Sequence, residues 1–594
     1  MVAEFLRRYA RRYAATYALG LFFLVATNLL TVAIPRMQKE VFDELATTRR
    51  IEVVDHYALL IAGCALLVIL VRTLSRVLFF NPGRTIEFRV RNDMLARLLR
   101  MSPQFFRSWS IGDIMARAGD DATFVRALVG FSVVMALNIV VAAVLAVWQM
   151  WHTDAWLTVY CVIPMLAALM ALRAGVKHTF AMMKAGQEAL GKLSDTVLET
   201  YKGIAVVQGA AAESAFLQRF DADNLEYTRL NLRVTLVRTF LLPIVGVVGN
   251  VCIFLLLYVG GQHVAEGRMT LGDMAAYAAY VAVLVGALAS GGWVVGVLQR
   301  GMVSLRRVWD VLVLTPDLPE GTQPLPNLGH GLSVRVHDLT YRYPDAAPDA
   351  TPALQNVSFE LRPGHVLGVY GSVAAGKSTL VQILGRLALP PAGSVFLDGV
   401  DLLDVAGPDL RKAVAIVPQD AFLFSRSVHD NVGFLDRAAD IEETRVTRAL
   451  QRAQMANEVV RLENGVQTVV GERGLTLSGG QRQRVQLARA FYRGYRLLVL
   501  DDVLSAVDHD TEAQLLAVIQ EEIRACGTSA ILISHRLSAL AAADEILVLE
   551  RGQVVERGTH PQLLAHGGTY ARVWHAQRER ERDPGAEDGD LVLA

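Results

Sequence analysis

Residues 365–387 read HVLGVYGSVAAGKSTLVQILGRL, and this stretch decides the fold of the second half of the chain. An apolar strand runs into a loop of small residues that ends in Gly-Lys-Ser-Thr, and an apolar helical pattern follows. This strand–loop–helix setting is what the G-x-x-x-x-G-K-S/T pattern requires. The loop amides and the amino end of the helix can hold phosphate oxygens. The sequence therefore predicts a nucleotide site, in preference to a Gly-rich turn that matches by chance.

The predicted phosphate loop comprises Gly371, Ser372, Val373, Ala374, Ala375, Gly376, Lys377, Ser378 and Thr379. We expect Lys377 to reach the terminal phosphates and the Ser378 hydroxyl to bind Mg²⁺. A second apolar strand, RLLVLD at 496–501, ends in a carboxylate, so that Asp501 can hold the same ion through water. Asp502 then lies where a base or a water-positioning residue belongs. ATP and Mg²⁺ are thus the expected ligands.

Upstream of this domain the chain is apolar in long blocks. The 594 residues carry no net charge, which gives no indication of nucleic-acid binding, and the mean hydropathy of +0.34 is high for a soluble protein. Six apolar runs lie at 17–35, 57–80, 127–150, 155–176, 240–264 and 274–298. Each is near or above the roughly 20 residues that a helix needs to cross a bilayer. Six such runs cannot all be buried cores of a soluble domain.

The distribution of basic residues predicts the orientation in the membrane. Basic clusters lie at 7–12, 84–126 and 177–238, whereas the turn between the third and fourth runs has no lysine or arginine. The segment after the first run is an exception, because it carries four basic residues, offset by five acidic ones. We therefore expect a multi-pass protein of the cell inner (cytoplasmic) membrane, with both termini and the nucleotide domain in the cytoplasm.

Two smaller features concern the membrane part. Residues 1–16 alternate arginine pairs with aromatic and apolar residues, which predicts an amphipathic elbow helix on the inner membrane face. Arg72 and Arg76 lie inside the second apolar run. Charges at membrane depth are expensive and often functional. The preferred interpretation is nevertheless that both side chains snorkel from the cytosolic end of a long helix.

The segment LTLSGGQRQR at 475–484 makes a family resemblance specific. Its core resembles the signature motif of ATP-binding-cassette (ABC) transporters, and it consists of Leu477, Ser478, Gly479, Gly480 and Gln481. In that family the motif binds the γ-phosphate of the ATP held by the opposite cassette. A Ser–Gly–Gly run that opens a helix offers a hydroxyl, amides and the helix dipole to an anion. An ordinary helix cap would account for the serine alone.

Further segments match the motifs of this family in register. Tyr343 resembles the aromatic residue that stacks on adenine, Gln419 the glutamine that touches Mg²⁺, and His535 the switch histidine on the γ-phosphate. Glu472 resembles the cross-talk segment, and Asp508 the loop that links the two ATP sites. Looser matches in the membrane part extend the resemblance over nearly the whole chain. The chain is similar to bacterial multidrug-exporter-like half transporters.

The resemblance implies a multidomain fold. An all-α transmembrane domain of six helices with long cytosolic extensions is followed by an α/β P-loop NTPase cassette with a helical subdomain. The expected parts are the elbow helix at 1–16, the membrane domain at 17–314, a Pro-rich linker at 315–331, the cassette at 332–578 and a charged, disordered tail at 579–594.

Asp502 stands where this family usually has glutamate. Its carboxylate is one methylene shorter and is expected to hold the attacking water poorly. Lys377, Ser378, Gln419 and Asp501 leave the binding of ATP and Mg²⁺ intact. A complete signature beside a slow site resembles one subunit of heterodimeric exporters.

We therefore expect an ATP hydrolase coupled to transport. As one half of a dimer with a second half transporter, it would export small hydrophobic or amphiphilic molecules (drug-like compounds, lipids or peptides) from a lipid membrane by alternating access. Two alternatives stay open. The first is a homodimeric exporter in which Asp502 is catalytically competent, and the second is an ATP-binding membrane regulator without transport.

Overall fold

The computed structural model of the chain describes residues 1–47, 51–318, 320–326, 329–347, 350–434, 436, 440–503 and 509–582. The chain forms two compact units. The first unit comprises Met1–Leu99 and Trp109–Thr315. The second comprises Arg100–Ser108, which includes the short helix α4 (Phe105–Ser108), and Pro316–Ala594.

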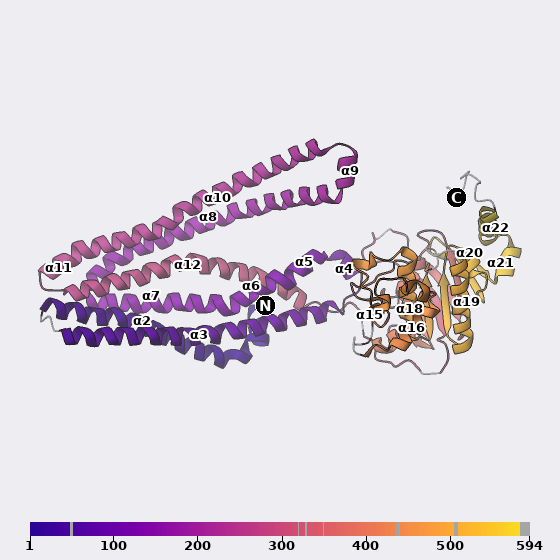
Figure 1. Cartoon of the computed structure of the whole chain (residues 1–594), viewed down its shortest axis with the longest axis horizontal. Helices are drawn as coiled ribbons and strands as arrows, with labels where there is room; N and C mark the ends of the chain where they lie inside the picture. The colour runs from indigo at the N-terminus through magenta and orange to yellow at the C-terminus, as the bar shows by residue number, and fades with distance from the viewer. Residues whose placement is uncertain are drawn as a thin grey trace. The chain divides into compact units, whose positions relative to one another are not determined.

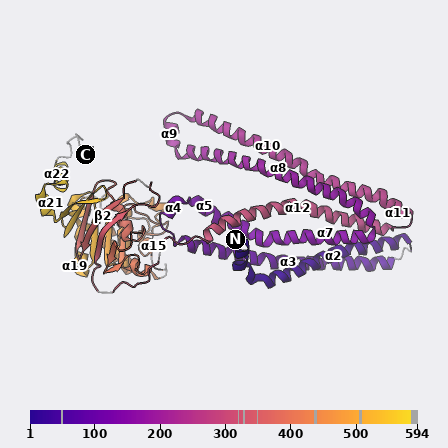
Figure 2. The ribbon, with the colours of Figure 1, turned by 180° about the vertical axis from the view of Figure 1, so that it is seen from behind.

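The first unit is a bundle of long helices (Figure 1). Its helical segments are α1 (Val2–Phe5), η1 (Leu6–Ala10), η2 (Arg11–Tyr13), α2 (Ala14–Thr47), α3 (Ile51–Leu98), α5 (Ile111–Ala116), η3 (Arg117–Asp121), α6 (Ala122–Ala127), η4 (Leu128–Ser132), α7 (Val133–Thr153), α8 (Ala155–Lys202), α9 (Ile204–Gly209), α10 (Glu213–Leu255), η5 (Leu256–Gly260), α11 (Gly261–Ala265) and α12 (Leu271–Leu312). Helices α8 and α10 run side by side and are joined through α9, and α2 lies along α3 (Figures 1 and 2).

Six helical stretches of this unit are long and apolar enough to cross a membrane. They are Val2–Thr47, Ile51–Leu98, Ile111–Thr153, Ala155–Gly175, Pro243–Ala265 and Leu271–Leu312. Each contains or closely overlaps one of the apolar runs predicted from the sequence. The helices extend beyond these runs, as α8 does to Lys202, because the polar segments that follow are rich in good helix formers. The predicted fold class is therefore confirmed for this half of the chain.

Polar caps and glycines fix the turns and close contacts of the bundle. Asp154 separates α7 from α8, and its carboxylate accepts a hydrogen bond from the Leu157 amide at 2.8 Å. Thr270 opens α12 with a capping box that it shares with Asp273. A Cβ atom on Gly130 would lie 3.2 Å from the Phe79 carbonyl oxygen, so a small residue is needed where η4 meets α3.

The N-terminal helical segment packs on the bundle through its aromatic residues. Phe5 and Tyr9 are buried, and the Phe5 ring lies 6.3 Å from the ring of Trp309 on α12. The Tyr9 hydroxyl donates a hydrogen bond to Asp93 on α3 at 2.5 Å. At these two positions the apolar face of the segment is therefore covered by the protein itself.

The second unit contains two sheets, which the view of Figure 2 shows from behind. The larger sheet has the strand order β10-β9-β3-β8-β7-β6, and the smaller one the order β2-β1-β4-β5. The strands are β1 (Val334–Tyr341), β2 (Leu354–Leu361), β3 (Val366–Gly371), β4 (Val395–Leu397), β5 (Val400–Asp401), β6 (Val414–Val417), β7 (Leu497–Asp501), β8 (Ser529–Ile533), β9 (Glu545–Glu550) and β10 (Gln553–Gly558). From β9 to β6 neighbouring strands are parallel, and β10 joins as an antiparallel edge strand.

Helices pack around these sheets. They are α13 (Lys377–Leu384), α14 (Gly407–Ala413), α15 (Val428–Val432), α16 (Glu443–Arg452), α17 (Ala456–Val459), η7 (Gly465–Gln467), η8 (Glu472–Gly474), α18 (Gly479–Arg493), α19 (His509–Cys526), α20 (Leu537–Leu540), α21 (His560–His566) and α22 (Thr569–Arg582). Helices α15, α16 and α18 pack on one another and form the predicted helical subdomain. Strand β7 is buried over its whole length, which explains its continuous apolar sequence.

Candidate nucleotide-binding site

The parallel register of the large sheet brings four sequence motifs to one edge. Strands β3, β8, β7 and β6 are successive neighbours, so their carboxyl ends lie along the same side of the sheet. In the chain, the phosphate loop follows β3, His535 follows β8, Asp502 follows β7 and Gln419 follows β6. The carboxyl edge of a parallel sheet is where ligands bind in α/β folds. Residues more than 100 positions apart in sequence therefore meet at one site.

The phosphate loop has a backbone that only small residues permit. Gly376 has a φ of +98°, and a Cβ atom there would lie 2.5 Å from the Ala353 carbonyl oxygen. Ala374 also has a positive φ, of 64°. The Lys377 ammonium group folds back over the loop and donates hydrogen bonds to the carbonyl oxygens of Gly371 (2.5 Å) and Ser372 (2.7 Å). The side chain thus already spans the hollow in which phosphate oxygens would sit.

The residues at this edge fit Mg²⁺ and a nucleotide. The Ser378 side chain lies near enough to Asp501 to lower the pKa of its carboxyl group, which brings the two expected ion ligands together. Burial and the neighbouring charge of Asp502 raise the pKa of Asp501, against the opposing effects of Ser378 and Lys377. Burial also lowers the pKa of Lys377. Adjacent buried carboxylates beside an ammonium group form a set that a divalent cation and phosphates would complete.

Asp502 occupies a distinctive position directly after β7. Its φ is +52°, and its amide donates to the Ile533 carbonyl oxygen at the end of β8 at 2.8 Å. The carboxylate is 3% exposed. Its Oδ2 atom lies 2.7 Å from Nε2 of His535 and 3.4 Å from Nε2 of Gln419. The Asp502 carboxylate therefore contacts both His535 and Gln419.

Tyr343 also meets the loop. Its hydroxyl lies 3.0 Å from the Thr379 hydroxyl oxygen, and its half-buried ring packs edge-on against Tyr341 at 5.2 Å. The Tyr341 hydroxyl in turn accepts a hydrogen bond from Gln104 at 2.8 Å. The aromatic residue expected to stack on adenine is thus held at the phosphate loop by a polar contact.

The signature segment caps a helix of its own. Ser478 begins α18, where its hydroxyl accepts from the Gln481 amide at 3.2 Å and the Gln481 side chain accepts from the Ser478 amide at 2.9 Å. This capping box leaves the amides of the first two helical residues, Gly479 and Gly480, without an intrahelical acceptor. The Ser478 hydroxyl hydrogen also remains available to donate. Leu477 is buried in the core of the cassette.

The signature and the phosphate loop are separate features of this chain. In the part of the chain that the structure describes, no hydrogen bond or ion pair joins 477–481 to 371–379. Glu472 begins η8 and is exposed. Asp508 lies outside the described residues.

One buried ion pair beside the site was not predicted from the sequence. Glu512 on α19 is 2% exposed and binds the guanidinium group of Arg536 at 2.6 Å, directly beside His535. This ion pair ties the start of α19 to the segment that carries the histidine. The sequence offers only one indication of this pair, because Glu512 ends the segment LDDVLSAVDHDTE (500–512). A glutamate that is buried needs a partner of opposite charge.

Comparisons with known proteins show the family of the chain. Residues 17–288 match the family described as ABC transporter transmembrane region, and residues 354–505 match ABC transporter. A Bacillus subtilis protein, titled probable multidrug resistance ABC transporter ATP-binding/permease protein YheI, is 30% identical over 581 residues, which are 98% of this chain and 97% of the relative. An ATP-dependent lipid A-core flippase of Xanthomonas euvesicatoria is 32% identical over 84% of each chain. The solved structure of a bacterial Atm1-family ABC exporter with ATP bound superposes with a TM-score of 0.80 at 23% identity, covering 98% of this chain and 99% of the other.

Proposed function

This chain belongs to the ABC transporters, and we propose that it exports small hydrophobic or amphiphilic molecules across the cytoplasmic membrane by alternating access. The observation that carries the proposal is the fusion of six helical stretches, long and apolar enough to cross a membrane, to a cassette whose sheet edge brings together the phosphate loop, Gln419, Asp502 and His535. Relatives along nearly the full length are named for multidrug resistance, and others for lipid A-core flipping. The basic clusters of the sequence support a cytoplasmic cassette and cytoplasmic termini.

ABC exporters work as dimers, and this chain carries features that suit a dimer. It has one phosphate loop and one signature, and the two are not joined to each other. The tip of the α8–α10 hairpin also exposes apolar side chains, including Tyr201 (72% exposed) and Val206 (74% exposed). Exposed apolar clusters of this kind mark protein interfaces. The hairpin tip is therefore our candidate surface for the second half transporter.

We further propose that the partner is a different half transporter and that this chain supplies the slow ATP site. In phosphoryl transfer the protein mainly positions groups and stabilises charge. The loop amides and Lys377 would hold the phosphates, while Ser378, Asp501 and Gln419 would hold Mg²⁺, which offsets the developing negative charge. A base must also come within hydrogen-bond reach of the attacking water. The short Asp502 carboxylate is instead engaged with His535 and Gln419, which favours binding over hydrolysis.

The homodimer remains the second candidate, because His535 is present and in contact with Asp502. In that case Asp502 acts through an additional water, and the chain alone hydrolyses ATP and transports. The regulator without transport would bind ATP and move no cargo with any partner.

Inverted membrane vesicles from the native host test the proposal. ATP-dependent accumulation of a hydrophobic fluorescent dye should occur in vesicles that contain this chain and should be lost with Lys377→Ala. Proteoliposomes that contain only this chain should accumulate little dye. Equal accumulation with wild type and Lys377→Ala would contradict export, and full transport by the chain alone would establish the homodimer.

A further inference from the structure

A polar pocket lies inside the membrane unit, between helices α2, α3, α7 and α12. Its volume is about 350 Å³. Its wall combines apolar side chains with hydroxyl, amide and guanidinium groups, and the charged residues among those that line it are Arg72 and Arg76 on α3. No acidic residue lines the pocket in the part of the chain that the structure describes. A pocket of this size suits a small molecule or a head group.

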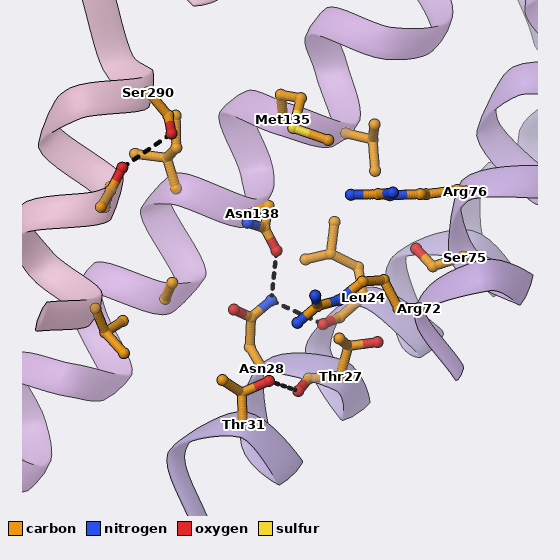
Figure 3. Close-up of a pocket in the computed structure, with 16 residues that line it drawn as sticks. Leu24, Thr27, Asn28, Thr31, Arg72, Ser75, Arg76, Met135, Asn138 and Ser290 are labelled. Atoms are coloured by element: carbon orange, nitrogen blue, oxygen red, sulfur yellow. Dashed lines mark hydrogen bonds between the residues drawn. The ribbon is translucent and has the colours of Figure 1, made fainter. Parts of the chain in front are cut away.

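The two arginines point into this pocket. Figure 3 shows the Arg76 guanidinium group extended below Met135, and that of Arg72 directed toward Asn28. Spaced four residues apart, they share one face of α3. Both side chains keep access to solvent. Both side chains therefore line the pocket, and their snorkelling from the cytosolic end of α3 stays a prediction.

The other polar side chains of the pocket form their hydrogen bonds with groups of the protein itself. Asn28 is buried, and its amide group donates both to the Leu24 carbonyl oxygen (2.9 Å) and to the Asn138 side-chain oxygen (3.0 Å). Thr27, Ser75 and Ser290 donate to backbone carbonyl oxygens. Among the described residues, neither guanidinium group of Arg72 or Arg76 has a hydrogen-bond or ion-pair partner. The pocket is thus preorganised around two uncompensated positive charges.

The two neighbouring positive charges of Arg72 and Arg76 are unfavourable in the free protein. Like charges four residues apart on a helix repel each other. Ionisable residues within membrane segments are costly and mark ligand or ion pathways. A ligand oxyanion would offset both charges, and guanidinium groups bind carboxylate or phosphate oxygens through paired hydrogen bonds. The lining residues Leu24, Ile139 and Val283 offer apolar surface to the remainder of the same ligand.

We propose that this pocket binds the anionic head group of an amphiphilic cargo through Arg72 and Arg76. The inference rests on the proposed export function and narrows its substrate class to amphiphiles that carry an exposed phosphate, sulfonate or carboxylate. The Asn28–Asn138 hydrogen bond holds α2 to α7 beside the head group, and the apolar lining residues contact the first part of the tail.

Binding of matched amphiphiles to the full-length chain tests the proposal. The chain is placed in nanodiscs of zwitterionic phosphatidylcholine, and radiolabelled dodecyl phosphate is titrated, with protein-free nanodiscs correcting for partition. Dodecyltrimethylammonium and dodecyl maltoside serve as competitors with the same tail. Arg72→Gln/Arg76→Gln should weaken dodecyl phosphate binding at least about tenfold, because two charge-assisted contacts are lost. Arg72→Lys/Arg76→Lys keeps the charge but loses the paired hydrogen bonds, so its affinity should lie between those of the wild type and the double Gln variant.

A matched control is Arg84→Gln, which removes an exposed arginine of α3 that does not line the pocket. It should bind dodecyl phosphate as the wild type does. ATP binding and the thermal unfolding midpoint, measured on every variant, show that the chain is folded. Wild-type affinity in the double Gln variant, or equally effective competition by dodecyltrimethylammonium, would overturn the proposal.

Two further arms identify the source of the anion. Displacement of the probe by phosphatidylglycerol added to the nanodiscs would support head-group recognition with a membrane lipid as the occupant. Displacement by inorganic phosphate as effective as that by dodecyl phosphate would overturn the amphiphile assignment. Charge-selective binding without ATP-dependent accumulation of an anionic amphiphilic dye would leave the pocket intact and refute export. Dye accumulation without charge-selective binding would refute the pocket alone.

Discussion

The nucleotide edge of the cassette and the pocket of the membrane unit present opposite patterns of charge. At the nucleotide edge, positive and negative groups lie together, as Lys377 does with Asp501 and Asp502. In the membrane pocket two arginines stand among neutral side chains. The first pattern suits a polyanion that arrives with a divalent cation, because the carboxylates need the ion and the ammonium group needs the phosphates. The second suits an anion that arrives without a metal.

This difference teaches that the charges around a site describe its ligand more closely than the number of polar groups does. Both sites contain hydroxyl and amide side chains, and in both these groups bond to the protein. The ionic groups differ. Changes that remove, add or neutralise a charge therefore separate the two sites better than changes of shape.

The largest effect is expected at the nucleotide edge. Lys377→Ala removes the ammonium group that spans the phosphate loop. ATP affinity should fall by about a hundredfold or more, since hydrogen bonds to charged groups contribute about 1.5–3 kcal/mol each. Fluorescent ATP-analogue binding to the purified chain measures this. Lys412→Ala, at an exposed lysine of α14, should bind ATP normally, and an equal loss there would contradict a specific role for Lys377.

A carboxylate introduced by mutation should give the membrane pocket charges of both signs, as the nucleotide edge has. Ser290 lies on α12, across the pocket from the arginines in Figure 3. Ser290→Asp supplies a counter-charge and should weaken dodecyl phosphate binding by about tenfold, whereas Ser290→Asn, of similar size, should change it little. Titration of dodecyl phosphate against both variants in nanodiscs measures the two effects. Equal effects of Asp and Asn would mean that shape rather than charge governs this pocket.

The neutral framework of the pocket should contribute stability rather than selectivity. Asn138→Leu removes the acceptor of the Asn28 amide and should cost about 1 kcal/mol, as interhelical hydrogen bonds in membranes do. A lowered thermal unfolding midpoint of the chain in nanodiscs would report it. Asn81→Leu, at an exposed position of α3, should leave the midpoint nearly unchanged. A stable Asn138→Leu chain would show that the amide pair does not hold α2 against α7.

The smallest effect concerns a histidine outside both sites. Burial, followed by the charge of Arg578, lowers the pKa of His560, whose Nδ1 atom lies 2.7 Å from the Tyr570 hydroxyl oxygen. The unfolded chain therefore takes up this proton more readily than the folded chain. Stability should be fully present above the ordinary histidine range and should decline as the pH falls through it. Unfolding midpoints between pH 8 and 5.5 should fall less steeply for His560→Gln than for the wild type.

The sequence could indicate that the nucleotide motifs meet at one edge because they follow strands that the parallel register must align, whereas the roles of their residues stay predictions. The apolar runs likewise predicted the six membrane stretches, although not how far α8 continues. The orientation of Arg72 and Arg76 could not be predicted, since it depends on the space that α2, α7 and α12 leave open. The pairing of Glu512 with Arg536 could not be predicted from the sequence either, because it depends on the packing of α19. The role of Asp508 stays a prediction.

The most direct test of the account is the Mg-ATPase rate of the purified chain in nanodiscs, measured for the wild type, Asp502→Glu and Asp502→Ala. ATP binding by all three is checked on the same samples. The account predicts a slow wild type that Asp502→Ala barely changes and that Asp502→Glu accelerates about tenfold or more, because a longer carboxylate reaches the attacking water. An ordinary exporter rate in the wild type, abolished by Asp502→Ala, would contradict the slow site and make this chain a homodimeric pump.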